Sequence, residues 1–342
     1  MNRLLYLDWL RVCATICVVI IHVCAAGYVG TLQPDGETTW FIGNFFETIS
    51  RWAVPGFVMI SGALLLKDQR EMSYWDFLMK RASKVIIPFV GWSVLFYVYG
   101  AYKGYFPLSI KSAIKAFINN GITYHFWFFY MIIGLYLITP LLKVFVKHAQ
   151  KHHIEYFLIL WLYASVITGL SNFLFGMKFS LELEYVTGYV GYFLLGYYLS
   201  YFEIKKFWRR LSYFGLGIGI LSLFFLTYHY TLVNGGKLSQ YWYGYFSPSV
   251  FLISAGLFIL FRYNFNKLSL PIIFSPINKA SLGIYILHYW LMNNYLWKVF
   301  PQVNANFHQV LVIPINIIIT FVLSALITIV LQRIPIVKKL VP

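Results

Sequence analysis

A histidine and an arginine interrupt the first apolar stretch of this sequence, "LDWLRVCATICVVIIH" at residues 7–22. Arg11 and His22 stand 11 positions apart. Because an α-helix turns roughly 100° and rises about 1.5 Å per residue, both side chains leave one face of the helix, about 16 Å apart along its axis. A charged group in the middle of a membrane-spanning helix costs at least ~2.5 kcal/mol, so the pair indicates a functional role.

These two residues are suited to different chemistry. An imidazole can act as a general base because its pKa lies near neutrality. The guanidinium of Arg11 can bind phosphate groups through charge-assisted hydrogen bonds, and Asp8, three residues earlier, can pair with it. Simpler interpretations stay open: Arg11 as an anchor that snorkels to the membrane surface, and His22 as a core histidine bonded to a neighbouring helix.

The second apolar stretch, "FIGNFFETISRWAVPGFVMISGALLL", also carries charge. Glu47 and Arg51 are spaced i,i+4 and are predicted to form an ion pair. Arg51 is expected near the membrane depth of His22, which favours a role beyond that of a solvated rim charge. Ser61 and Gly62 lie near the inner end, where glycine lets backbones approach closely, and Pro55 predicts a kink.

Two later stretches add polar groups to apolar helices. "YHFWFF" places His125 and Trp127 at the outer boundary of a span, where aromatic rings often gather. "SLGIYILHYW" carries Ser281, Tyr285 and His288 at i, i+4 and i+7, so all three are predicted on one helix face. Hydrogen bonds between helices are the simpler explanation for that face.

The remaining candidates are basic or imidazole groups near span ends. Arg81 and Lys84 stand where a span leaves the inner surface, which is consistent with lipid headgroups or with an anionic cofactor. His148, His152 and His153 are predicted to lie in a solvated loop. They do not predict a metal site, because no cysteine or carboxylate ligands accompany them. No metal is expected.

The elements that must position these residues are membrane helices. The chain has 342 residues, of which 60% are hydrophobic and only 11% charged, too few charges for a soluble surface. The net charge of +16 is spread between apolar segments, which argues against a nucleic-acid partner. Three cysteines within the first apolar segment do not form a disulfide framework.

Spans of about 20 apolar residues define the expected architecture, which is an all-α integral membrane protein with about ten transmembrane helices. Of the 27 lysines and arginines, 20 fall in segments expected inside and six in outer loops, which places both termini in the cytoplasm. No separate soluble domain is expected, and residues 1–342 are taken as one domain. The expected spans are 10–29, 41–66, 85–102, 123–142, 154–175, 185–202, 211–230, 246–261, 280–297 and 308–331.

Taken together, these segments resemble the acyltransferase 3 family of integral membrane acyltransferases. Arg11 and His22 match its signature of an arginine, ten residues and a histidine, and "SRWAVPGFVMISGALL" looks like its SR-x-x-VP-x-FFMISG segment. "RASKVIIP" is similar to its R-x-x-R element, although Lys84 replaces the second arginine and loses the bidentate fork. "YHFWFF", "GYFLLGYYL" and "SLGIYILHY" look like further family segments. The resemblance is strongest to short stand-alone sugar O-acetyltransferases, such as the enterobacterial common antigen type.

The resemblance implies a multi-pass protein of the bacterial inner membrane. It would move an acyl group, most often acetyl from acetyl-CoA, to a hydroxyl of a lipid-linked or cell-surface saccharide. We expect Arg11, Arg81, Lys84 and Ser61 to bind the acyl donor. In catalysis we expect His22 as general base, with Arg51, Tyr285 and His288. We expect His125, Trp127 and Ser281 to bind the saccharide acceptor. A covalent acyl-histidine intermediate stays open beside direct transfer, and the oligomeric state is not predicted.

Two other functions fit the same residues. Charges inside a membrane can line a substrate path, as in a transporter or flippase of a polyprenyl-linked saccharide. A lipid- or partner-binding scaffold without chemistry is the third interpretation. Consumption of labelled acetyl-CoA would distinguish the enzyme from the transporter, and loss of two or more motif residues without loss of phenotype would favour the scaffold.

Overall fold

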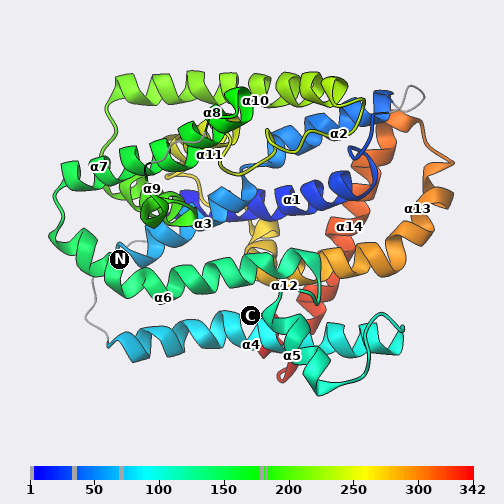
Figure 1. Ribbon diagram of the computed structural model, residues 1–342. Coiled ribbons are helices and arrows are strands. Elements are labelled where there is room, and N and C mark those ends of the chain that lie inside the picture. The colour runs from blue at the N-terminus through cyan, green and yellow to red at the C-terminus, as the bar shows by residue number, and fades with distance from the viewer. Residues whose placement is uncertain (1–3, 33–36, 69–72, 178–180, 182) are drawn as a thin grey trace.

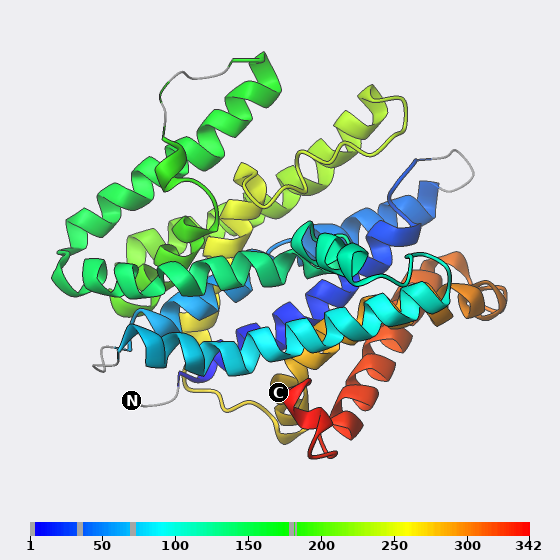
Figure 2. The same cartoon turned by 60° about the horizontal axis from the view of Figure 1, so that its bottom comes forward.

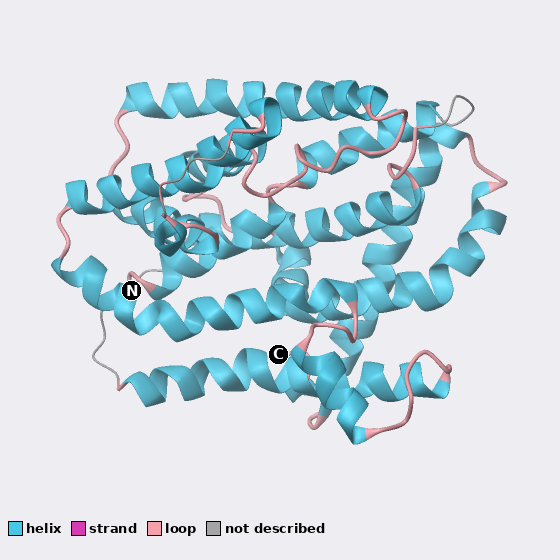
Figure 3. Cartoon of the chain, in the orientation of Figure 1, coloured by secondary structure: helices cyan, strands magenta, loops and turns pink. Residues whose placement is uncertain are grey.

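This computed structural model describes residues 4–32, 37–68, 73–177, 181 and 183–342, and helices make up most of them (Figures 1 and 3). Within those residues there is no strand, and the single β-bridge joins Thr31 to Lys237. The predicted all-α membrane architecture is confirmed.

The described residues form fourteen α-helices. They are α1 (Leu5–Gly27), α2 (Glu37–Ser50), α3 (Ala53–Leu65), α4 (Tyr74–Tyr102), α5 (Ile110–Ile118), α6 (Trp127–His148), α7 (Lys151–Leu162), α8 (Thr168–Phe175), α9 (Tyr189–Tyr201), α10 (Lys206–Val233), α11 (Pro248–Asn264), α12 (Ser275–Leu291), α13 (Trp297–Asn304) and α14 (Gln309–Leu331). A 3₁₀ turn, η2 (Tyr124–Phe126), leads into α6, and the π-helical turn Met292–Leu296 joins α12 to α13.

Seven helical segments of the described chain are long and apolar enough to cross a membrane, and α11 is a shorter apolar helix. The predicted sixth span contains α9, which has 13 residues, and the predicted ninth span overlaps α12, which has 17 residues and begins five residues earlier, at Ser275. The number of ten spans, the cytoplasmic termini and the single domain stay predictions. Three residues counted in the charge asymmetry, Arg3, Arg70 and Lys178, lie outside the described residues.

The second predicted span is broken between α2 and α3. The break lies at Arg51 and Trp52, one turn before Pro55. A proline has no N–H to donate, and its ring clashes with the carbonyl of the residue four positions earlier. The expected kink is therefore present, but displaced toward the N-terminus, and it lets Arg51 occupy the junction between two helices.

Glycines bring α3 and α9 into backbone contact. A Cβ atom added to Gly62 would lie 1.8 Å from the carbonyl oxygen of Phe193. On the facing helix, a Cβ added to Gly196 would lie 2.0 Å from the carbonyl oxygen of Met59. The close approach predicted from Gly62 is confirmed, and no larger residue fits at either position.

The first helix, α1, lies inside the helix bundle. α1 packs against α2, α3, α11, α12 and α14, and Figure 2 shows it with helices on both sides. Its polar residues therefore face protein, which is where ionisable groups of a membrane helix are expected.

Candidate active site

Three histidines from distant parts of the sequence meet at one place. The ring of His22, on α1, lies 4.8 Å from that of His288, on α12, between ring centres. His125, in η2, lies 6.3 Å from His22 and 5.7 Å from His288. The first two were predicted to act together, whereas His125 was expected to contact the acceptor.

Hydrogen bonds determine which nitrogen of His22 carries a lone pair. His288 Nδ1 lies 3.0 Å from the carbonyl oxygen of Ile284, and its Nε2 lies 3.1 Å from His22 Nδ1. His22 Nδ1 is also 2.8 Å from the carbonyl oxygen of Val18. Carbonyl oxygens only accept, so each Nδ1 carries the hydrogen in the neutral rings. The lone pair of His22 is then on Nε2, the atom that a general base needs.

His125 is fully buried and bonded on both sides of its ring. Its Nε2 lies 3.2 Å from the carbonyl oxygen of Ile286, and its Nδ1 lies 3.1 Å from the hydroxyl of Thr123. The Tyr285 hydroxyl donates to the backbone carbonyl of His125. These contacts fix η2 against α12. His125 therefore has a structural role outside the cavity lining.

A cavity of about 580 Å³ opens beside His22. Of the predicted site residues, its lining contains His22, Arg51, Trp127 and Tyr285. It also contains residues that the sequence did not single out, from the loop between α10 and α11 and from the end of α1: Gly30, Lys237, Leu238, Gln240, Tyr243, Gly244 and Tyr245. His288, His125 and Ser281 are outside this lining.

Arg51 presents a buried cation to this cavity. Its Nε lies 2.8 Å from Oε2 of Glu47, a residue with no exposed surface, so the predicted ion pair is confirmed. The guanidinium carbon lies 4.4 Å from the centre of the Tyr243 ring, a cation–π contact. The Tyr243 hydroxyl donates to Asn44 at 2.6 Å, which fixes that ring.

The two loop tyrosines remain hydrogen-bond donors at neutral pH. Burial raises the pKa of Tyr245 to about 12, although the nearby Arg51 opposes this shift. Burial also raises the pKa of Tyr243 well above its usual value. Both phenols therefore keep their protons; that of Tyr243 is donated to Asn44, which leaves Tyr245 as the loop phenol able to donate to a developing oxyanion.

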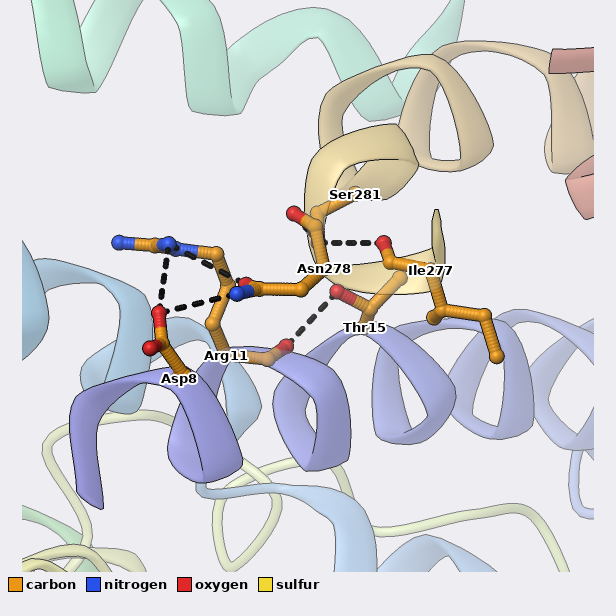
Figure 4. Close-up of polar contacts among 6 residues, drawn as sticks. All are labelled: Asp8, Arg11, Thr15, Ile277, Asn278 and Ser281. Atoms are coloured by element: carbon orange, nitrogen blue, oxygen red, sulfur yellow. Dashed lines mark hydrogen bonds and ion pairs between the residues drawn. The ribbon is translucent and has the colours of Figure 1, made fainter. Parts of the chain in front are cut away.

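The other predicted cation, Arg11, belongs to a polar cluster between α1 and α12 (Figure 4). Its Nη1 lies 3.6 Å from Oδ1 of Asp8 and 3.2 Å from Oδ1 of Asn278. Asn278 in turn donates to Asp8 at 2.9 Å. The predicted pairing of Asp8 with Arg11 is confirmed, and Asn278 is a third member that the sequence did not single out.

Arg11 and His22 both face α12. Arg11 meets Asn278 near the start of that helix, and His22 meets His288 near its end. The shared face predicted from their spacing is confirmed, and the order of contacts shows that α1 and α12 run parallel. Ser281 lies in the Arg11 region, where its hydroxyl donates to carbonyls of its own helix.

The other residues predicted to bind the acyl donor, Ser61, Arg81 and Lys84, do not form a hydrogen-bonded cluster like that of Arg11. The Tyr136 hydroxyl lies beside Ser61 and within electrostatic reach of Arg11 and Arg81. Arg81 is half-buried, with its guanidinium 5.6 Å from the Phe77 ring, whereas the Lys84 side chain is exposed. Tyr136 is thus a neighbour of Ser61 that the sequence did not single out.

A family model described as an acyltransferase domain matches residues 4–331. The chain belongs to the acyltransferase 3 family. This confirms the resemblance, and it makes the protein a multi-pass membrane acyltransferase that takes an acyl donor and an acyl acceptor. Within the described residues of this acyltransferase, no cluster of histidine, cysteine and carboxylate side chains could hold a metal.

A more distant likeness covers part of the acyltransferase. A serine/alanine racemase from Enterococcus gallinarum is 27% identical over 170 residues, which are 47% of this chain and 21% of the racemase. This chain therefore matches about a fifth of the racemase, and the likeness assigns no activity to it. No solved structure matches the acyltransferase.

Proposed function

We propose that this acyltransferase moves an acetyl group from cytoplasmic acetyl-CoA to a hydroxyl of a lipid-linked or cell-surface saccharide, with His22 as general base. The observation that carries the proposal is that His22 and Arg51 line one cavity while the Nδ1 of His22 is held by the Val18 carbonyl and by His288. The protein would do this work in the bacterial inner membrane, with both termini in the cytoplasm.

The transfer needs one proton acceptor and one stabiliser of negative charge. His22 Nε2 takes the proton from the saccharide hydroxyl, and the oxygen attacks the thioester carbonyl, forming a C–O bond. The C–S bond then breaks, and the leaving thiolate takes the proton back from His22. Arg51 and the Tyr245 phenol stabilise the oxyanion in this proposal, because both are hydrogen-bond donors that line the cavity with His22.

His288 and Tyr285 act by positioning. His288 holds His22 in the tautomer that leaves Nε2 free of a proton. Tyr285 holds η2 through the His125 carbonyl, next to Trp127, which lines the cavity. Trp127 provides an aromatic wall for the acceptor, with Tyr245 5.8 Å away between ring centres. His125 and Ser281 then support the site without contacting substrate.

The donor binds at the opposite end of α1 in this proposal. Arg11, Arg81 and Lys84 contact the phosphates of coenzyme A, with Ser61 and Tyr136 beside them. The pantetheine arm then runs along α1 and covers the distance of about 16 Å from Arg11 to His22.

Transfer of radiolabelled acetyl from acetyl-CoA to membrane glycan, by the purified protein in lipid nanodiscs, tests the proposal. We expect His22→Ala to lower the rate by at least about 100-fold, because general acid–base catalysis contributes about that much. The matched control is His229→Ala, an exposed histidine outside the cavity lining. An unchanged rate in His22→Ala contradicts the mechanism, and a wild-type protein that never consumes the thioester favours a transporter or flippase.

A further inference from the structure

A second cavity, of about 500 Å³, adjoins the one at His22. The two share Lys237, Leu238 and Gln240 in their linings. The second cavity extends toward α8 and α10 and is otherwise lined by Phe173, Tyr230, Val233, Asn234, Ser239 and Tyr241. The two cavities are therefore neighbours that meet at one stretch of the loop after α10.

The lining of the second cavity has the chemistry of a saccharide site. Phe173 and Tyr241 stack at 3.9 Å between ring centres, and Tyr230 meets Phe173 edge-on at 4.9 Å. Because the two stacked rings cover one face of each other, each has at most its outer face left for the C–H face of a sugar, while nearby amides and hydroxyls bond the sugar hydroxyls. Asn234 and Gln240 supply those amides, and apolar walls with a few fixed polar groups are typical of ligand sites.

The loop that carries the shared residues is held in place. Its amide at Leu238 donates to the carbonyl of Gly30 at 3.1 Å, and its Gly236 carbonyl accepts from the amide of Leu32 at 2.7 Å. Asn234 closes the turn by donating to the Lys237 carbonyl at 3.0 Å. A loop already fixed in its bound shape loses little entropy when a ligand binds.

The charge at the junction of the two cavities is positive. Lys237 is exposed and lines both, and neither lining contains an aspartate or a glutamate. The other cation in the lining, Arg51, is paired with Glu47, a buried side chain outside it. A negative group next to the reacting sugar of an acceptor could pair with Lys237, because no carboxylate in the lining of either cavity competes for this lysine.

We propose that the acceptor is an oligosaccharide that carries an anionic group, a uronate carboxylate or a phosphate, at the position of Lys237. Its reacting sugar lies at His22, and its neighbouring sugars lie on the aromatic wall of Phe173, Tyr230 and Tyr241. This inference rests on the proposed function, because it names the acceptor of the same site.

Binding of defined tetrasaccharides to the purified protein, without acetyl-CoA, tests the proposal. The probes are an N-acetylglucosamine tetramer, a tetramer that alternates glucuronate with N-acetylglucosamine, and the first tetramer carrying a 1-phosphate. We expect at least one anionic probe to bind about fivefold more tightly than the neutral one, the advantage of one exposed charge pair. Lys237→Gln removes that advantage, Lys237→Arg retains it, and the two anionic probes identify which group is preferred.

Lys298→Gln is the matched control, since Lys298 is also exposed but lines neither cavity. Equal binding of all three probes to the wild type, or equal losses in Lys237→Gln and Lys298→Gln, overturns the inference. Phe173→Ala adds a length test, because Phe173 lines only the second cavity: we expect it to weaken binding of the tetramers but not of N-acetylglucosamine itself. These measurements omit the donor, so their failure leaves the acetyl transfer tested by His22→Ala untouched.

Discussion

At the scale of single residues, hydrogen-bond direction decides what each ionisable group can do. Backbone carbonyls accept hydrogen bonds from the Nδ1 atoms of His22 and His288. The lone pair of neutral His22, which lines the cavity, is therefore on Nε2. His125, chemically identical, has both ring nitrogens occupied within the protein. Residue type alone therefore does not separate the reactive imidazole from the supporting one.

The buried pair of Glu47 and Arg51 carries a prediction about stability at this scale. Arg51→Gln leaves the Glu47 carboxylate buried without its partner, so we expect the free energy of unfolding to fall by about 3 kcal/mol. The double variant Glu47→Gln with Arg51→Gln removes both charges and should recover much of this loss. Chemical unfolding in detergent measures both, and equal losses in the two variants would contradict the pairing argument.

At the scale of elements, close backbone contacts hold the scaffold that carries Arg51. The facing glycines let α3 lie directly on α9, so Gly196→Ala forces the two helices apart and should destabilise the protein by about 1–3 kcal/mol. Gly134→Ala, on α6, is the matched control because a Cβ there meets nothing within 4 Å.

Thermal unfolding of the two variants in the same detergent measures this difference. We expect the midpoint to fall for Gly196→Ala and to stay level or rise for Gly134→Ala, since alanine favours the helix where space allows. Similar shifts in the two variants would show that the contact between α3 and α9 is not tight.

At the scale of the whole molecule, the proposed reaction needs the donor and the acceptor at opposite membrane faces. The cavity at His22 is lined by the end of α1 and the loop after α10, whereas Lys84 lies near the start of α4. With both termini in the cytoplasm, Gln240 should therefore be outside and Lys84 inside.

Cysteine labelling in intact cells tests that arrangement. In a background with Cys13, Cys17 and Cys24 changed to alanine, we expect Gln240→Cys to react with a membrane-impermeant maleimide. Lys84→Cys should react only after the membrane is opened, and both replaced side chains lie on the surface of the protein. Labelling of both from the same side would refute the proposed topology.

The sequence by itself determined the features that repeat along one element. Composition indicated a membrane protein, and helical spacing predicted the pairs of Asp8 with Arg11 and Glu47 with Arg51, all of which are confirmed. The same spacing predicted that Arg11 and His22 share a face, because a helix relates residues on one face by its fixed period.

Only the tertiary structure decided which faces meet. His22 and His288 are 266 positions apart, and Arg11 and Asn278 are 267 apart, so no local period connects them. Tyr243 and Tyr245 come from a loop, whose path depends on the helices it joins. The cavity exists because packing of distant elements brings these groups together, and packing energy depends on neighbours in space that a single sequence does not reveal.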